Sequence, residues 1–142
     1  MYQKIMVPVD ESQASMRALD EACRLAKSNQ TAVCAIHILD YAQFAWGKDG
    51  LQGDVSRDAV IAQARAKMAQ YQIAGDAEVL NNTGEKVAHI IVREAQKRDC
   101  DLIIMGTHGL TGVKHLLMGS VAEGVLRESK TPVMLIRHAD ES

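Results

Sequence analysis

The sequence contains little cysteine. Cys23, Cys34 and Cys100 are odd in number, lie far apart and include no C-x-x-C pair. This pattern disfavours both a disulfide framework and a zinc site. We therefore expect each cysteine to be a small, buried or half-buried side chain in a reducing cytoplasm.

An excess of charge of one sign is also absent. Sixteen Lys and Arg residues stand against 18 Asp and Glu, which gives a formal net charge of -2, and no basic run could follow a phosphate backbone. Aromatic residues make up 4% of the chain, so side chains on which bases could stack are few. Nucleic acid is accordingly not expected as a partner.

No long apolar run is present. No stretch approaches the ~18 consecutive apolar residues of a membrane span, and the N-terminal residues lack the apolar region and cleavage site of a signal peptide. We expect no membrane insertion. With 47% hydrophobic and 24% charged residues the 142-residue chain has a globular composition, and we expect one domain, residues 1–142.

What the sequence does contain is an alternation of apolar runs with helix-spaced apolar positions. The runs predict five strands: Lys4 to Val9, Thr31 to Leu39, Ala77 to Leu80, Leu102 to Met105, and Val133 to Ile136. Four predicted helices separate them: one after Ser12 and Ser15, one with Ile61, Ala64, Met68 and Tyr71 on one face, one with Val87, Ile90, Ile91 and Ala95, and one beginning near Ser120. Continuous apolar strands are typical of a parallel sheet covered on both faces. We predict an α/β fold: a single doubly wound, Rossmann-like, five-stranded parallel sheet of order 3-2-1-4-5 with helices on both faces.

Two segments between these elements resist a simple interpretation. Tyr41 to Asp54 contains glycine together with Tyr41, Phe44 and Trp46. It is predicted to be a loop that packs its aromatic residues on the domain, with a lid or a partner contact as the alternative. The segment Asn81 to Gly84 is predicted to be a turn.

The expected ligand position follows from the strand order. In an open α/β sheet a ligand binds beyond the carboxyl ends of the strands, where the order reverses. For the order 3-2-1-4-5 that point lies between the first and fourth strands. The loops after Val9 and after Met105 are therefore the candidates.

The loop after Met105 is rich in glycine. Gly106, Gly109 and Gly119 are expected to leave backbone N–H groups accessible to an anion, and Ser120 opens a helix whose N-terminus attracts phosphate. Alternatively, the glycines only form turns and Ser120 caps the helix in a capping box with Glu123. Both interpretations can hold together.

Other phosphate-binding and catalytic patterns are missing. The sequence contains no G-x-x-x-x-G-K-[ST], and Asp10, Glu11 and Ser12 follow the first strand in place of G-x-G-x-x-G. P-loop hydrolysis and dinucleotide binding are poor fits. A phospho-receiver domain also fits poorly, because the third strand ends in Asn81 instead of an aspartate.

Three side chains are candidates for ligand contact or for purely structural roles. Asp10 is predicted to accept a hydrogen bond from a ribose hydroxyl or to lie near a phosphate-bound Mg²⁺, with capping of the following helix as the alternative. Ile38 would supply an apolar wall, with main-chain groups beside it that read an adenine edge. His108 either approaches phosphate or faces solvent. The remaining histidines lack metal-ligand spacing and a paired carboxylate, and are predicted to be structural or superficial: His37, His89, His115 and His138.

These residues resemble the universal stress protein family, in its ATP-binding subgroup, from Met1 to Arg137. The resemblance rests on four segments: Lys4 to Asp10, His37 to Asp40, Asp101 to Gly109, and Gly119 to Glu123. The glycine spacing matches the family's G-2x-G-9x-G-[ST] signature.

The resemblance implies an ATP site, with AMP or ADP as alternatives and Mg²⁺ bound through the phosphates. Pro8, Val9, Asp10 and Ile38 would surround adenosine. The ribose and phosphates would lie among Met105, Gly106, Thr107, His108, Gly109, Gly112, Gly119, Ser120 and Val121. Many relatives place a basic residue after the second glycine, where this chain has Leu110, so the preference for triphosphate over AMP is open.

The resemblance also implies a homodimer formed through the last strand, Val133 to Ile136, whose apolar edge would otherwise invite uncontrolled pairing. The predicted function is an adenine-nucleotide-binding stress-response regulator, a switch that acts through nucleotide-dependent dimer contacts or contacts with an unknown regulatory protein. The alternatives are a slow ATPase or autophosphorylating enzyme, and a nucleotide-free dimeric interaction module. No catalytic residue and no protein metal ligand is predicted.

Overall fold

The computed structural model describes residues 2–40, 50–82, 84–108 and 118–137. Within them, strands and helices alternate: β1 (Lys4–Pro8), α1 (Gln13–Asn29), β2 (Ala32–Asp40), α3 (Gly50–Tyr71), β3 (Gly75–Asn82), α4 (Val87–Lys97), β4 (Leu102–Gly106), α5 (Ser120–Glu128) and β5 (Val133–Ile136). All strand pairs are parallel and the order is β3-β2-β1-β4-β5. The predicted fold class and strand order are confirmed.

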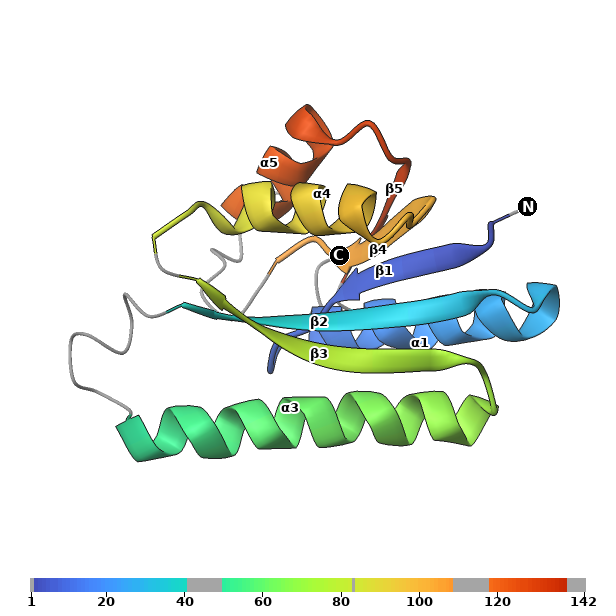
Figure 1. Ribbon diagram of the computed structural model, residues 1–142, viewed down its shortest axis with the longest axis horizontal. Helices are drawn as coiled ribbons and strands as arrows, with labels where there is room; N and C mark the ends of the chain where they lie inside the picture. Colours follow the sequence, from blue (N-terminus) through green and yellow to red (C-terminus); the bar gives the residue numbers. More distant parts are fainter. Residues whose placement is uncertain (1, 41–49, 83, 109–117, 138–142) are drawn as a thin grey trace.

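The helices cover both faces of the sheet, α1 and α3 on one and α4 and α5 on the other (Figure 1). This arrangement explains why the strands are continuously apolar. In β1, Ile5 and Val7 belong to the core beneath α1 and α3, whereas Met6 belongs to the core beneath α4 and α5. All three side chains are completely buried.

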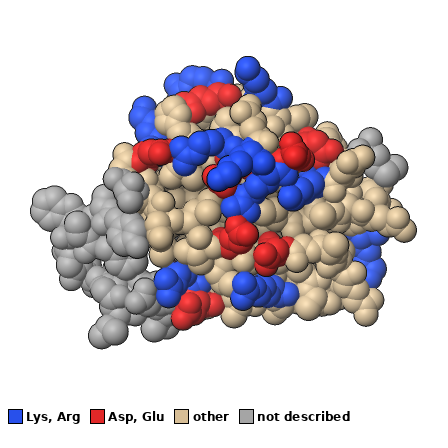
Figure 2. Space-filling model, viewed as in Figure 1, with Lys and Arg blue, Asp and Glu red and all other residues tan. Residues whose placement is uncertain are grey.

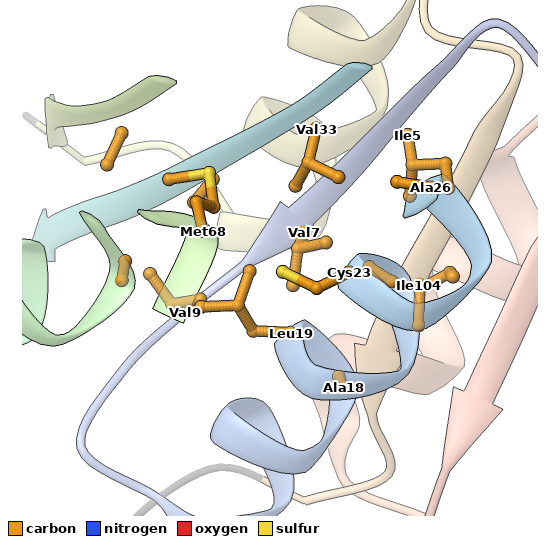
Figure 3. Packing of buried hydrophobic residues seen from close by; sticks show 14 of the residues in the cluster. Ile5, Val7, Val9, Ala18, Leu19, Cys23, Ala26, Val33, Met68 and Ile104 are labelled. Atoms are coloured by element: carbon orange, nitrogen blue, oxygen red, sulfur yellow. The ribbon is translucent and has the colours of Figure 1, made fainter. Parts of the chain in front are cut away.

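The core beneath α1 is built from small and medium side chains. Ala18, Leu19 and Cys23 of α1 pack against Val7 and Ile104 of the central strands (Figure 3). Small residues on the helix let it approach the sheet closely. Each fully buried Leu or Val contributes roughly 1.5–3 kcal/mol of transfer free energy.

The predicted buried faces of the other helices are largely confirmed. In α3, Ala64 and Met68 are buried, and in α4, Ile91 and Ala95 are buried. The three cysteines are free and buried, as expected from the sequence. Desolvation by burial and the charge of Asp20 raise the pKa of Cys23 to about 11.

Asp101 holds the N-terminal segment against the sheet. Its carboxylate accepts hydrogen bonds from the backbone N–H groups of Gln3 (2.9 Å) and Lys4 (3.0 Å), and its own N–H donates to the Lys4 carbonyl at 2.9 Å. Partial burial raises the pKa of Asp101, but these hydrogen bonds outweigh that effect and hold the pKa below the ordinary value. The carboxylate therefore fixes the segment that leads into β1.

Ion pairs join α4 to the edge strand β3. Arg98 reaches Glu78 of β3 at 2.6 Å and Glu94 of α4 at 2.9 Å, and Arg93 reaches Glu85 at 2.6 Å. On the face shown in Figure 2, basic and acidic side chains are interspersed. No helix in the described part of the chain is long and apolar enough to cross a membrane.

The structure corrects two predicted boundaries. The loop predicted from Tyr41 to Asp54 is wrong for its last five residues, because α3 begins at Gly50. Gly50 and Gly53 each lower the stability of a helix by about 1 kcal/mol relative to alanine, a loss that a helix of 22 residues tolerates. Tyr41, Phe44 and Trp46 lie outside the described residues. The turn after β3 begins later than predicted, since β3 continues to Asn82, whose side chain accepts from the N–H groups of Gly84 and Glu85.

Candidate functional site

The carboxyl ends of β1 and β2 are joined directly beyond Pro8. The N–H of Val9 donates to the carbonyl of Ile36 at 2.8 Å, and Nδ1 of His37 lies 2.8 Å from the carbonyl oxygen of Val9. Because a carbonyl only accepts, Nδ1 of His37 carries the proton in this contact. His37 is buried and structural, as predicted, and it fixes the chain just ahead of Asp10.

Asp10 begins a tightly hydrogen-bonded loop that enters α1. Its carboxylate Oδ1 accepts from the N–H of Ser12 at 2.7 Å. Ser12 is the N-cap of α1, and its hydroxyl accepts from the N–H of Ser15 at 3.2 Å. Asp10 therefore bonds the N–H of the N-cap residue Ser12 and is not itself the cap. The helix-capping role that the sequence offered as an alternative is thus present only indirectly.

Gly106, at the end of β4, faces the same first turn of α1. A Cβ at Gly106 would lie 2.8 Å from the Cβ of Ala14 and 2.9 Å from its carbonyl carbon. The absence of a side chain thus lets α1 pack directly on the end of β4. This contact brings the loop after β1 and the loop after β4 together, as the strand order predicts.

Gly119 and Ser120 differ from the predicted arrangement. Gly119 is the N-cap of α5 and Ser120 is its first residue, and α5 has no side-chain cap hydrogen bond. The predicted capping box of Ser120 and Glu123 is therefore wrong, because Ser120 lies one position too far along the helix. The N–H of Gly119 is also not available to an anion, since it donates to the carbonyl of Thr107 at 2.6 Å.

The N–H groups of the first turn of α5 are the candidates for anion binding in the described part of this loop. The first N–H groups of a helix have no partner within the helix, and here no capping side chain replaces one. The N–H of Glu123 already bonds to Gly119. Among the described residues, no partner outside the helix is recorded for the N–H groups of Ser120, Val121 and Ala122, which carry the positive end of the helix dipole and are the candidate anion donors of α5.

Apolar side chains border this edge on the side of α4 and α5. Met105 is buried, and Ile38 and Val121 are partly buried against the same cluster. Met118 and Leu80 are also partly buried there, and the sequence analysis did not select them. Met118 could have been found by its position directly before Gly119, whereas nothing in the sequence distinguished Leu80 from a core residue.

Thr107 and His108 continue from β4 toward this edge. Thr107 is buried, and its Oγ1 lies 3.2 Å from Nδ1 of His108. The N–H of Thr107 donates to the carbonyl of Ile136 in β5 at 3.0 Å. Thr107 thus connects β5, β4 and the start of α5 through its own peptide groups. The predicted site residues Gly109 and Gly112, together with Leu110, lie outside the described residues.

His89 lies at the surface, which agrees with the predicted structural or surface role. Only the predicted lack of a carboxylate partner is wrong: Nδ1 of His89 lies 3.1 Å from Oε2 of Glu128, because α4 and α5 pack side by side. His89 is exposed and lies in the first turn of α4. His115 and His138 lie outside the described residues. Among the described side chains, no group of three or more His, Cys, Asp or Glu residues is placed to hold a metal ion.

Taken together, the described site residues lie at one edge of the sheet. Pro8, Val9 and Asp10 come from β1 and the loop after it, Ile38 from β2, Met105 to His108 from β4 and its loop, and Gly119 to Val121 from the start of α5. The fold and these residues define a doubly wound α/β protein with a candidate ligand site where the strand order reverses.

The chain belongs to the universal stress protein family, whose profile it matches over residues 1–137. It is 32% identical over 146 aligned residues to universal stress protein MJ0531 of Methanocaldococcus jannaschii, covering 96% of this chain and 83% of the relative. The solved structure of MJ0577, from the same organism, superposes with a TM-score of 0.81 at 25% identity, covering 99% of both chains. The universal stress protein of Archaeoglobus fulgidus in complex with dAMP shares the fold, with a TM-score of 0.73 at 24% identity over 95% of this chain and 98% of the other.

Proposed function

We propose that this protein binds an adenine nucleotide at the carboxyl edge of its sheet and acts as a cytoplasmic stress-response regulator. The observation that carries the proposal is the start of α5, where Gly119 leaves the first turn without a capping side chain. The dAMP complex of the Archaeoglobus relative supports the choice of ligand.

The phosphates would be held by α5. The N–H groups of Ser120, Val121 and Ala122 offer hydrogen bonds, and the helix dipole favours negative charge at this end. Gly119, the cap residue, lies against the loop after β4, since a Cβ there would be 3.3 Å from the carbonyl oxygen of Thr107. Mg²⁺, if it accompanies ATP, would be held through the phosphates.

Adenosine would be held by the loop after β1 and the end of β2. Ile38 is partly buried and would supply apolar surface, and the main-chain groups beside it would offer donors and acceptors to the base. Asp10 would accept from a ribose hydroxyl. Pro8, Val9, Met105 and Gly106 would line the sugar and base, with Gly109 and Gly112 completing the phosphate loop.

The switch that we propose operates through the edge strand β5. In the described part of the sheet β5 pairs on one side with β4, and Met134 is 41% exposed. An apolar edge strand is suited to pairing with a second copy of itself. Nucleotide occupancy at α5 would alter the homodimer formed by Val133 to Ile136, or the binding of a regulatory protein partner.

A substitution at the first residue of α5 tests the phosphate site. Ser120→Asp adds a negative charge that the helix dipole stabilises but that repels phosphate. Ser120→Asn has nearly the same shape without the charge and is the matched control. Calorimetric titration should show ATP binding about tenfold weaker in the Asp variant than in the Asn variant, with a smaller difference for AMP.

Two results would count against the proposal. Equal affinities of the Asp and Asn variants for ATP would exclude phosphate from the start of α5. Absence of any adenine nucleotide in denatured wild-type protein, together with no rise in melting temperature on adding Mg-ATP or AMP, would exclude the nucleotide site itself. The dimer is tested separately by light scattering, in which Met134→Lys should convert a dimer to a monomer.

A further inference from the structure

Ser15 contacts Asp10 in a way that ordinary helix capping does not require. Its hydroxyl accepts a hydrogen bond from the N–H of Asp10 at 3.0 Å and lies 3.0 Å from the Asp10 carbonyl oxygen, to which it donates. A second acceptor, the carbonyl of Ser12, lies at 3.2 Å. Ser15 is 6% exposed, so these bonds are shielded from water. One hydroxyl thus holds both main-chain polar groups of Asp10.

The side chain of Asp10 is held on one side only. Its Oδ1 accepts from the N–H of Ser12 at 2.7 Å, which orients the carboxylate. Within the described residues, Oδ2 accepts no hydrogen bond. The main chain of Asp10 is therefore fixed by Ser15 and one carboxylate oxygen by Ser12, while the other oxygen remains available to a ligand.

We infer that Ser15 is a positioning residue for the nucleotide, which fixes Asp10 so that Oδ2 meets a sugar hydroxyl. The inference rests on the proposed nucleotide site. Ser15 acts through Asp10 and makes no contact with the ligand itself. Removal of its hydroxyl leaves the N–H of Asp10 without its partner, and the loop can then rotate the carboxylate away from the sugar.

Two probes separate this role from a general structural one. AMP carries the 2′- and 3′-hydroxyls, whereas 2′,3′-dideoxy-AMP lacks both and keeps the same base and phosphate. In Ser15→Ala, calorimetry should show AMP binding about tenfold weaker than in wild type, while binding of the dideoxy probe changes by less than about twofold. The hydroxyl-dependent part of the affinity is then the part that is lost.

Thr31 provides a matched control. It is 2% exposed, and its hydroxyl donates to a main-chain carbonyl, that of Tyr2, at 2.7 Å. It precedes β2 and so lies at the opposite edge of the parallel sheet from Asp10. Thr31→Val removes a buried hydroxyl at similar cost to folding and should leave the affinity for both probes unchanged.

The double variant Asp10→Ala with Ser15→Ala completes the test. Because Ser15 acts through Asp10, adding Ser15→Ala to Asp10→Ala should weaken AMP binding no further. Equal losses for both probes, or a further loss in the double variant, would overturn the inference. Wild-type protein that binds both probes equally would overturn it too, whereas wild-type protein that binds neither would refute the nucleotide site as a whole. If Ser15→Ala does not fold, Ser15→Cys, of similar volume but weaker hydrogen bonding, is judged by the same criteria.

Discussion

Gly106 offers a test of why a glycine stands at the end of β4. An added Cβ would lie 2.8 Å from the Cβ of Ala14, 2.9 Å from its carbonyl carbon and 3.1 Å from its carbonyl oxygen. Carbon atoms in good contact lie about 3.5–4.0 Å apart. Since two of the three contacts involve backbone, Gly106→Ala cannot be accommodated by rotating a side chain. The first turn of α1 must move away from the sheet.

The cost should be that of overpacking a close contact, about 2 kcal/mol. For a chain of this size, such a loss corresponds to a fall in melting temperature of roughly 4–8 °C. Urea unfolding followed by circular dichroism measures the loss directly, and the midpoint should fall without a change in slope.

Gly119→Ala is the comparison variant. The nearest atoms to its added Cβ are the Thr107 carbonyl oxygen at 3.3 Å and the His108 Cα at 3.6 Å. The backbone of Gly119, with φ -76° and ψ 170°, suits any residue. We expect a cost below about 1 kcal/mol, clearly smaller than that of Gly106→Ala.

A second-site variant sharpens the test. Ala14→Gly removes one of the three atoms that the new Cβ would meet, at a cost of up to about 1 kcal/mol to the helix. Combined with Gly106→Ala, it should cost less than the sum of the two single changes. The reasoning fails if Gly106→Ala unfolds at the wild-type urea concentration, or if the two changes simply add.

Three further outcomes are expected. Asp101→Asn should destabilise the protein at neutral pH. Because the pKa of Asp101 is lowered in the folded state, the loss of unfolding free energy relative to wild type is full above the ordinary aspartate pKa and disappears as the pH falls through the folded pKa. Urea unfolding at a series of pH values measures it. Tyr71→Phe removes a 2.8 Å hydrogen bond from the phenol to Asp20 between α1 and α3 and should cost about 1 kcal/mol, measured by thermal unfolding; an unchanged melting temperature would contradict it. Cys23, with its pKa raised to about 11 by burial and the charge of Asp20, should resist Ellman's reagent at pH 8 until urea unfolds the chain, and rapid labelling of the folded protein would oppose this.

The strands and their order could be predicted from the sequence because burial on both faces leaves an unbroken apolar run. Ile5, Met6 and Val7 alternate between the two cores, so none of the three positions can be polar. The order of the strands then placed Asp10 and Gly106 at one edge. The start of α3 was missed because Gly50 and Gly53 lower helix propensity, and a local preference of this size is overridden in a long helix.

The individual roles at the edge were harder to predict. A glycine is equally suited to a close helix contact and to anion binding, so the sequence could not show that Gly106 packs against Ala14. The N-cap of α5 is Gly119, one residue before the predicted cap Ser120, and a difference of one residue is within the uncertainty of a helix start predicted from sequence. The bond between Ser15 and the main chain of Asp10 depends on the path of the loop, which no local pattern specifies.

The peptide groups of Thr107 limit where the chain can be shortened. Its N–H is satisfied by the carbonyl of Ile136, and its carbonyl by the N–H of Gly119. A fragment that stops after α5 would leave the first bond unmade and would release the residue that anchors the start of α5. The last strand therefore supports the candidate ligand site and also forms an outer edge of the sheet. A truncation or circular permutation that removes β5 should abolish the ligand site together with that edge.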